Sequence, residues 1–260
     1  MKETLPKNVQ KFVNSYFNLN LGGKKIPCPY YINIKKIRQR MGLRVLIGKG
    51  TQEEIIQESL IYEKLRGTNF YDMSIYEIRE FLVKRHIGID CSGFIVHIIN
   101  YWLKGINKKN IWKYIKFPRQ TLYRKIARFF RPVENISAFQ LTNKDNSTPI
   151  KNLNNIRCGD LIRLKGLKGG YHVMMISKVI QNKGKVNSFK YIHATKWYEK
   201  QHGVREGCVI IKNVKEPLYK QKWTDYLNGR NWTYEEICKD KEYSQVRRLA
   251  QLPIYSTKST

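Results

Sequence analysis

Gly88-Ile89-Asp90-Cys91-Ser92-Gly93-Phe94 opens the strongest helical pattern in the chain. Apolar residues recur behind it at helical spacing, namely Phe94, Ile98 and Trp102 with Ile95 and Ile99 beside them. The spacing predicts a helix that begins at Asp90-Cys91, is buried on much of its circumference and ends at Gly105. A thiol in the first helical turn meets unpaired amides and the positive end of the dipole, which favour the nucleophilic thiolate. Cys91 is therefore a candidate nucleophile, and the alternative is a small buried side chain next to a helix-capping Asp90.

Two histidines lie on strands predicted further along the chain. His172 follows the turn residues Gly169-Gly170 at the start of an apolar strand, and His193 lies on the next strand. Neighbouring antiparallel strands bring such side chains together. A cysteine, a histidine that moves its proton and a third polar group that orients the imidazole form the logic of a catalytic triad.

Helical patterns fill the first half of the chain and strand patterns the second. Capping boxes at Thr51/Glu54 and Ser74/Glu77 predict helices that run to about residues 66 and 86. Further helices are expected at about 6–19 and 121–130, and strands at 160–165, 171–180, 188–195, 208–213 and 244–249, with a hairpin at 182–185. This order predicts an α+β fold with an antiparallel sheet.

The charge balance is strongly positive. The 260 residues include 49 Lys and Arg against 20 Asp and Glu, a net charge of +29. Such a field attracts polyanions, so an anionic wall polymer or a membrane surface is a candidate partner. The charges are dispersed, and no Arg-rich arm, zinc-finger spacing or RNP-type strand accompanies them, which disfavours nucleic acid and favours a compositional bias. The oligomeric state is left open.

The spacing of the cysteines and the length of the apolar runs exclude several classes of protein. Five widely spaced cysteines without a CxxC pair suggest neither a disulfide framework nor a zinc ribbon, and we expect no metal or other cofactor. No uncharged run is long enough to span a bilayer, and residues 1–21 lack a secretory signal pattern. These features predict a protein that is cytoplasmic or exported by a non-standard route.

The motifs together resemble the NlpC/P60 cysteine peptidases of bacterial cell-wall turnover, a papain-like family. The Asp-Cys-Ser-Gly-Phe hallmark is intact at 90–94, and it is followed in order by Gly159-Asp160-Leu161, His172-Val173 and Ile192-His193-Ala194-Thr195. The resemblance covers about residues 86–252. It implies a papain-like core in which the nucleophile helix packs on an antiparallel sheet.

The resemblance also assigns roles to individual residues. It implies Cys91 as nucleophile, His172 as general base and then acid, and His193 as the orienting third residue. The family's Pro-Tyr segment, whose Tyr supports the oxyanion or positions substrate, corresponds to Pro29-Tyr30, with Tyr31 as the second choice. Asp90 and Ser92 line the site in the family and hold the free amino end of a stem peptide, although a capping role for Asp90 is equally compatible with the sequence.

The chain departs from the family pattern before the cysteine. Tyr30 precedes Cys91 by 61 residues instead of about a dozen, so the two capped helices form an insertion within residues 34–85. We expect an N-terminal extension with this insertion at 1–85, packed on a catalytic domain at 86–252, and a tail at 253–260. No SH3-like wall-binding module is recognisable.

The function that the resemblance implies is hydrolysis of an amide bond in a peptidoglycan stem peptide, next to D-glutamate. One alternative keeps the triad but acts as an amidase or acyltransferase on another peptide or on a lipid. A second is a basic nucleic-acid-binding protein with an inactive peptidase-like core.

Overall fold

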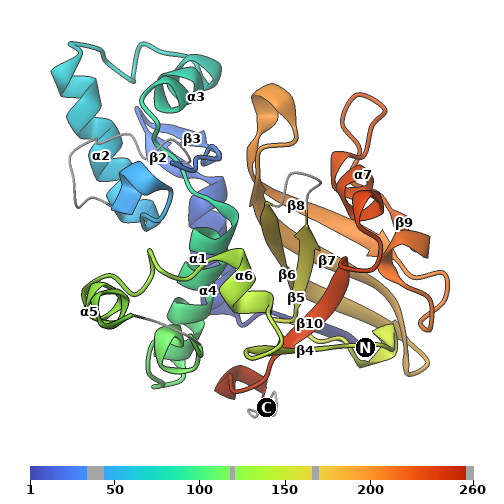
Figure 1. Ribbon diagram of the computed structural model, residues 1–260. Coiled ribbons are helices and arrows are strands. Elements are labelled where there is room, and N and C mark those ends of the chain that lie inside the picture. The colour runs from blue at the N-terminus through green and yellow to red at the C-terminus, as the bar shows by residue number, and fades with distance from the viewer. Residues whose placement is uncertain (34–43, 118–120, 166–169, 256–260) are drawn as a thin grey trace.

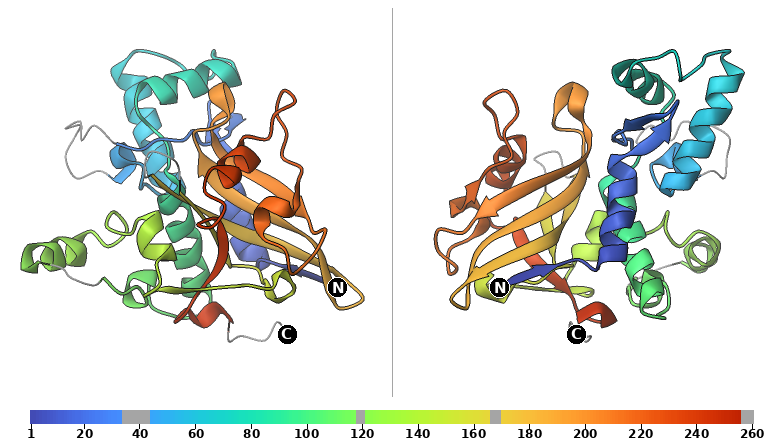
Figure 2. Two further views of the ribbon diagram at one scale, coloured as in Figure 1. Left: turned by 45° about the vertical axis from the view of Figure 1, so that its right-hand side comes forward. Right: turned by 180° about the vertical axis from the view of Figure 1, so that it is seen from behind.

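The computed structural model describes residues 1–33, 44–117, 121–165 and 170–255. Most of the helices gather on one side of the molecule, and a curved antiparallel sheet, with the helix Trp232–Lys239 beside it, forms the other (Figure 1). Two further views show the same arrangement, with α1 (Lys7–Phe17) and α4 (Cys91–Gly105) between the outer helices and the sheet (Figure 2). The predicted α+β class is confirmed at this level, while the papain-like character of the core stays a prediction.

The helices begin and end close to where local sequence signals place them. They are α1 (Lys7–Phe17), α2 (Gln52–Leu65), α3 (Ile75–Lys84), α4 (Cys91–Gly105), α5 (Leu122–Phe130), α6 (Ala138–Thr142) and α7 (Trp232–Lys239). Both predicted capping boxes are present, with Thr51 paired to Glu54 and Ser74 to Glu77. A third, at Ser137 before α6, was not predicted.

The strands form one large sheet and a small hairpin. The bounds are β1 (Lys2–Thr4), β2 (Leu19–Leu21), β3 (Lys24–Ile26), β4 (Ser147–Pro149), β5 (Leu161–Lys165), β6 (Tyr171–Asn182), β7 (Lys185–Thr195), β8 (Gly203–Ile210), β9 (Lys222–Trp223) and β10 (Gln245–Leu249). The main sheet runs in the order β4-β10-β5-β6-β7-β8-β9, and β1 pairs with the second half of β6. The strands β2 and β3 pair separately.

The central hairpin carries both histidines of interest. The strands β6 and β7 pair from Asn182↔Lys185 down to Met175↔Ile192, and the turn residues Lys183 and Gly184 both have positive φ. The predicted hairpin is therefore confirmed. The strand predicted at 208–213 is displaced, because β8 starts at Gly203 and pairs with β7 from Thr195 onward.

The helix α4 lies in the core against β6 and β7, as predicted for the nucleophile helix. Asp90 caps it by accepting a hydrogen bond from the backbone amide of Gly93 at 2.6 Å. A Cβ at Gly93 would lie 2.7 Å from the carbonyl oxygen of Gly48, so only glycine lets the segment at 48–49 approach the helix. This close approach brings Lys49 next to the start of α4.

The N-terminal residues pack on the same core. The ring of Phe12 in α1 stacks on Tyr101 in α4 at 4.3 Å, and Tyr16 meets Phe94 edge-on at 5.2 Å. The proposed boundaries at residues 85 and 252 stay predictions. Residues 34–43 of the insertion, Gly169 of the predicted turn and residues 256–260 of the tail lie outside the described residues.

Candidate active site

Cys91 is the first residue of α4 and its side chain is almost completely covered, with 5% exposed. The backbone amide of Val173 interacts with its sulfur. Because Val173 follows His172 directly on β6, this contact brings the start of α4 to the part of the sheet that carries the predicted base. All five cysteines are free thiols.

The two predicted histidines touch. His172 Nε2 lies 3.0 Å from His193 Nδ1, with the rings nearly perpendicular. His172 keeps 8% of its surface exposed, while His193 is completely buried. The indole of Trp197 packs on His172 with ring centroids 4.4 Å apart, so this tryptophan edges the site.

The contact between the rings restricts their tautomers. Only one proton can lie between His172 Nε2 and His193 Nδ1. If His172 donates it, His172 Nδ1 carries a free lone pair and can accept a proton from a thiol. His193 then carries its own proton on Nε2, a buried nitrogen for which no hydrogen-bond partner is found among the described residues. Such an arrangement suits a base with an orienting third residue.

Burial keeps both imidazoles neutral. It lowers the pKa of His172 to about 3, and the nearby charge of Lys196 acts in the same direction. The pKa of His193 is also held well below its usual value by burial, with smaller effects from His172 and Arg205. The imidazole pair is therefore uncharged at neutral pH.

The thiol is also neutral in the resting state. Burial raises the pKa of Cys91 to about 12, and the carboxylate of Asp90 adds to the rise. The contacts that lower this pKa, from the amides of Val173 and Ser92 and the charge of Lys49, are weaker. The thiolate expected from the helix end is thus not the resting form, because desolvation outweighs the favourable amides.

Tyr30 lies next to the cysteine despite the long separation in sequence. The backbone around it pairs with the residue before the hallmark: Ile89 N donates to Pro29 O at 3.0 Å, and Tyr31 N donates to Ile89 O at 3.2 Å. The pKa of Tyr30 is raised mainly by burial, and its nearness to the Cys91 thiol and the Asp90 carboxylate adds to the rise. Its hydroxyl therefore shares the environment of the thiol.

Tyr31 is placed differently. Its ring packs against the imidazole of His86 at 5.2 Å, and burial alone raises its pKa. Of the two tyrosines considered from the sequence, Tyr30 is the one with an electrostatic link to Cys91.

Asp90 and Ser92 have an internal partner that the sequence did not indicate. The ammonium of Lys49 lies 3.1 Å from Asp90 Oδ1, 2.6 Å from Ser92 Oγ and 3.1 Å from the carbonyl oxygen of Ile136. Ser92 also donates to Asp90 at 3.1 Å. All three side chains are buried, with 3–6% exposed. The one sequence signal for this lysine is its position between Gly48 and Gly50, which is too common a pattern to indicate a role.

Two further histidines, His97 and His202, contact backbone groups. His97 Nε2 lies 2.8 Å from the carbonyl oxygen of Lys49, and burial lowers its pKa to about 4. His202 Nδ1 accepts a hydrogen bond from the backbone amide of Tyr30 at 3.2 Å. Within the described residues, no group of three His, Cys, Asp or Glu side chains is arranged to hold a metal ion.

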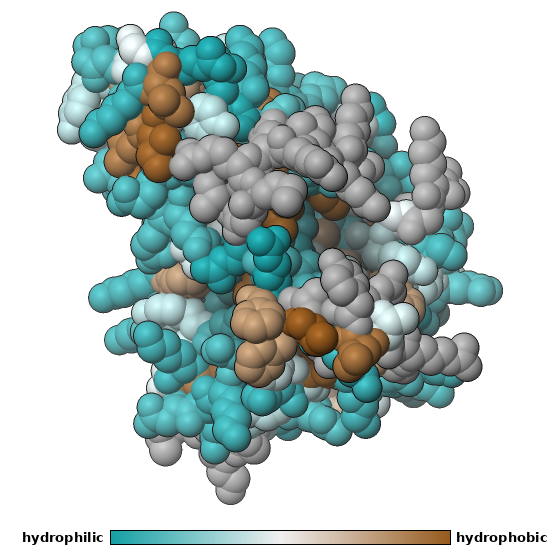
Figure 3. All heavy atoms as spheres, turned by 60° about the vertical axis from the view of Figure 1, so that its left-hand side comes forward, coloured by the Kyte–Doolittle hydropathy of each residue, from teal (hydrophilic) through white to brown (hydrophobic). Residues whose placement is uncertain are grey.

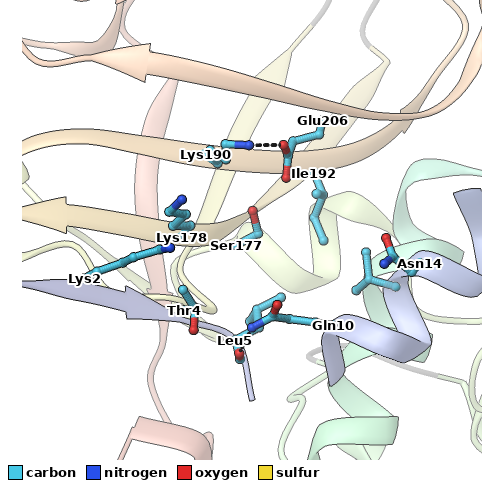
Figure 4. A pocket seen from close by; sticks show the side chains of 11 residues that line it. Lys2, Thr4, Leu5, Gln10, Asn14, Ser177, Lys178, Lys190, Ile192 and Glu206 are labelled. Atoms are coloured by element: carbon cyan, nitrogen blue, oxygen red, sulfur yellow. Dashed lines mark hydrogen bonds and ion pairs between the residues drawn. The ribbon is translucent and has the colours of Figure 1, made fainter. Parts of the chain in front are cut away.

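A pocket of about 250 Å³ lies elsewhere, between α1, β1 and the strands β6 to β8 (Figure 4). Its lining includes Lys2, Ser177 and Lys178, together with the ion pair Lys190–Glu206. None of the three predicted catalytic residues lines it.

The fold and the site define an α+β protein in which a helix-terminal cysteine faces a strand that carries one of two paired histidines. A family model described as "Putative amidase domain" matches residues 69–205, and the chain belongs to this family. The matched segment contains Cys91, His172 and His193, whereas Tyr30 and Lys49 precede it. The assignment is to an amidase-like, hydrolytic class, and the finer resemblance to NlpC/P60 peptidases stays a hypothesis. No curated protein and no solved structure matches the chain.

None of the helices in the described part of the chain has the length and apolar composition needed to cross a bilayer.

Proposed function

We propose that the protein is a cysteine hydrolase of amide bonds, with Cys91 as nucleophile, His172 as general base and acid, and His193 as the residue that orients His172. The observation that carries the proposal is the 3.0 Å contact between His172 Nε2 and His193 Nδ1. It leaves His172 Nδ1 for the thiol, whose sulfur interacts with the backbone amide of the next residue on β6. Membership of an amidase family supports the reaction class.

The neutral resting forms of the Cys91 thiol and the His172 imidazole determine how the first step proceeds. As the sulfur of Cys91 bonds to the substrate carbonyl carbon, its proton passes to His172 Nδ1, so charge develops only when substrate is present. The backbone amide of Cys91 and the hydroxyl of Tyr30 are the proposed donors to the resulting oxyanion.

The same histidine completes the turnover. The imidazolium of His172 gives its proton to the leaving amine as the carbon–nitrogen bond breaks, which leaves a thioester on Cys91. Water then attacks the thioester with His172 as base, releasing the acid and the free thiol. His193 accepts the hydrogen bond from His172 Nε2 throughout and keeps Nδ1 directed to the sulfur.

The proposed substrate is a peptidoglycan stem peptide cleaved next to D-glutamate, a choice supported by the motif resemblance. The contacts of Lys49 modify how such a peptide would bind. Its ammonium already occupies the oxygens of Asp90 and Ser92, the pair expected to hold the substrate's free amino end. We therefore propose that this chain accepts stem peptides without requiring that amino group.

The test compares cysteine variants and matched substrates. Wild-type protein should release the amine from a γ-D-glutamyl-diamino acid peptide, Cys91→Ala should be inactive, and Cys158→Ala, which alters another buried thiol, should retain activity. Activity that survives in Cys91→Ala would overturn the mechanism. Transfer of the acyl group to an added amine in place of water would favour the acyltransferase alternative.

The substrate proposal has its own control. The same peptide with its amino end acetylated should be cleaved within a few-fold of the free form, because no amine site is vacant. A preference of about tenfold or more for the free amine would contradict the role given to Lys49 while leaving the thiol mechanism intact.

A further inference from the structure

The helix α5 exposes a continuous apolar face. Its residues Leu122, Ile126, Phe129 and Phe130 are 74%, 52%, 68% and 76% exposed. Their spacing of four, three and one residues places them on one side of an α-helix. The helix stands off from the body of the molecule in both Figure 1 and Figure 2. Figure 3, which brings this side forward, shows apolar residues gathered on the surface.

Exposed cations flank this apolar face along the sequence. From residue 104 to residue 131 the chain contains ten Lys and Arg and no Asp or Glu. The exposed cations among the described residues of this segment are Lys104, Lys108, Lys109, Lys113, Lys116, Lys125 and Arg131. The segment is therefore more uniformly positive than the chain as a whole.

We propose that α5 docks on an anionic lipid surface, with its apolar side chains inserted among the acyl chains and the exposed lysines of the same segment on the headgroups. Short amphipathic helices with basic flanks bind membrane interfaces in this way. Each lysine near such a surface adds to the attraction, which falls off within a Debye length. This inference is independent of the proposed catalytic function.

Other occupants fit the two observations less well. A nucleic acid or a soluble wall polymer would meet the cations but leave the apolar side chains in water. A second copy of the chain would cover the apolar side chains but bring two strongly positive segments together. An anionic membrane satisfies both the charge and the apolar surface.

The test uses the full chain and vesicles. Wild-type protein should sediment with equimolar phosphatidylglycerol–phosphatidylcholine vesicles and not with phosphatidylcholine alone. The double variant Ile126→Gln/Phe129→Gln should bind the anionic vesicles about tenfold or more weakly, because apolar burial is lost. The matched control Leu65→Gln/Tyr71→Gln changes two side chains of similar exposure outside α5 and should bind like wild type.

A second variant separates the charge from the apolar face. The substitution of Lys108, Lys109 and Lys113 by Gln should weaken vesicle binding by about fivefold per lysine. The unfolding midpoints of all variants should match wild type, since every changed side chain is exposed.

Several outcomes would overturn the proposal. Vesicle binding that is unchanged by Ile126→Gln/Phe129→Gln would mean that the apolar face takes no part. An equal loss of vesicle binding in Ile126→Gln/Phe129→Gln and in Leu65→Gln/Tyr71→Gln would show a nonspecific apolar effect. A wild-type dimer in sedimentation velocity that dissociates in the α5 variant would identify a second copy as the occupant. Tight binding to dextran sulfate without vesicle binding would identify a soluble polyanion.

Discussion

The two sides of the candidate site differ in how they arrange charge. On the helix side, Cys91 lies beside a buried ion pair, with the ammonium of Lys49 shared between Asp90 and Ser92. On the sheet side, His172 and His193 contact each other and Trp197, and burial holds both imidazoles neutral. The helix side balances its charges within an ion pair, and the two imidazoles of the sheet side carry no charge.

This difference explains why the Cys91 thiol and the two imidazoles rest in their neutral forms. A buried thiolate would add a second negative charge beside Asp90, whose carboxylate already has its counter-ion in Lys49. A buried imidazolium would have no carboxylate in hydrogen-bond contact with it among the described residues. The proposed mechanism therefore moves one proton between neutral partners when a substrate arrives.

Removing the base should have the largest effect. We expect His172→Gln to lower kcat by about 10²–10⁴, the range attributed to general acid–base catalysis. The control His86→Asn keeps a side chain that tolerates the positive φ of that residue and should retain near-normal activity. Comparable losses in both variants, measured by steady-state amine release, would show that the effect is not specific to the imidazole pair.

Removing the Lys49 ammonium from the helix side of the site should mainly lower the free energy of unfolding. Lys49→Met leaves the buried carboxylate of Asp90 without its cation, which typically costs about 3–5 kcal/mol of unfolding free energy. The double variant Lys49→Met/Asp90→Asn should recover most of this loss, because Asn also caps a helix.

The exposed pair Lys190–Glu206 provides the control for that prediction. The substitution Lys190→Met should change the unfolding free energy by about 1 kcal/mol or less, since its partners are solvent-exposed. Urea denaturation of the three variants measures these unfolding free energies. A loss for Lys49→Met that is no larger than the loss for Lys190→Met would contradict the prediction.

Removing the proposed oxyanion donor Tyr30 should lower kcat less than removing the base. We expect Tyr30→Phe to reduce kcat by about 10²–10³, as for removal of one oxyanion donor, with KM nearly unchanged. Tyr31→Phe should have little effect because that ring packs against His86. Equal effects of the two substitutions on kcat would remove Tyr30 from the mechanism.

The last prediction tests the resting state of the thiol through its dependence on pH, with an effect of about tenfold for each pH unit. Below the pKa of about 12 for Cys91, the thiolate fraction falls tenfold for each unit that the pH falls. The rate of iodoacetamide labelling at Cys91 should therefore rise about tenfold per pH unit from pH 7 to 10, without a plateau. The Cys91→Ser variant gives the background from the other four thiols. A plateau in the neutral range would reveal a preformed thiolate–imidazolium pair.

Local signals predicted the parts of the fold that depend on neighbouring residues. The capping boxes at Thr51 and Ser74 identify the starts of α2 and α3, and the hairpin position follows from the turn at Lys183-Gly184. The contact between His172 and His193 follows from two strands that are adjacent in sequence and in the sheet. Short strands such as β1 carry too few residues for a pattern.

Long-range contacts were not predictable in the same way. Lys49 meets Ser92 and Ile136 across 43 and 87 residues, and nothing near it in the sequence indicates either contact. The raised pKa of Cys91 depends on complete burial, whereas the sequence showed only the helix end that acts in the opposite direction. Tyr30 was identified by resemblance, and its position near Cys91 depends on backbone pairing with Ile89.

The most direct measurement is the mass of the acyl-enzyme. Incubation with a slowly hydrolysed activated ester, followed by digestion and mass spectrometry, should locate the acyl group on the peptide that contains Cys91. The account predicts that this adduct forms in wild type, forms far more slowly in His172→Gln and is absent in Cys91→Ser. Turnover in wild type with no acyl group on Cys91, or with the adduct on another residue, would contradict it.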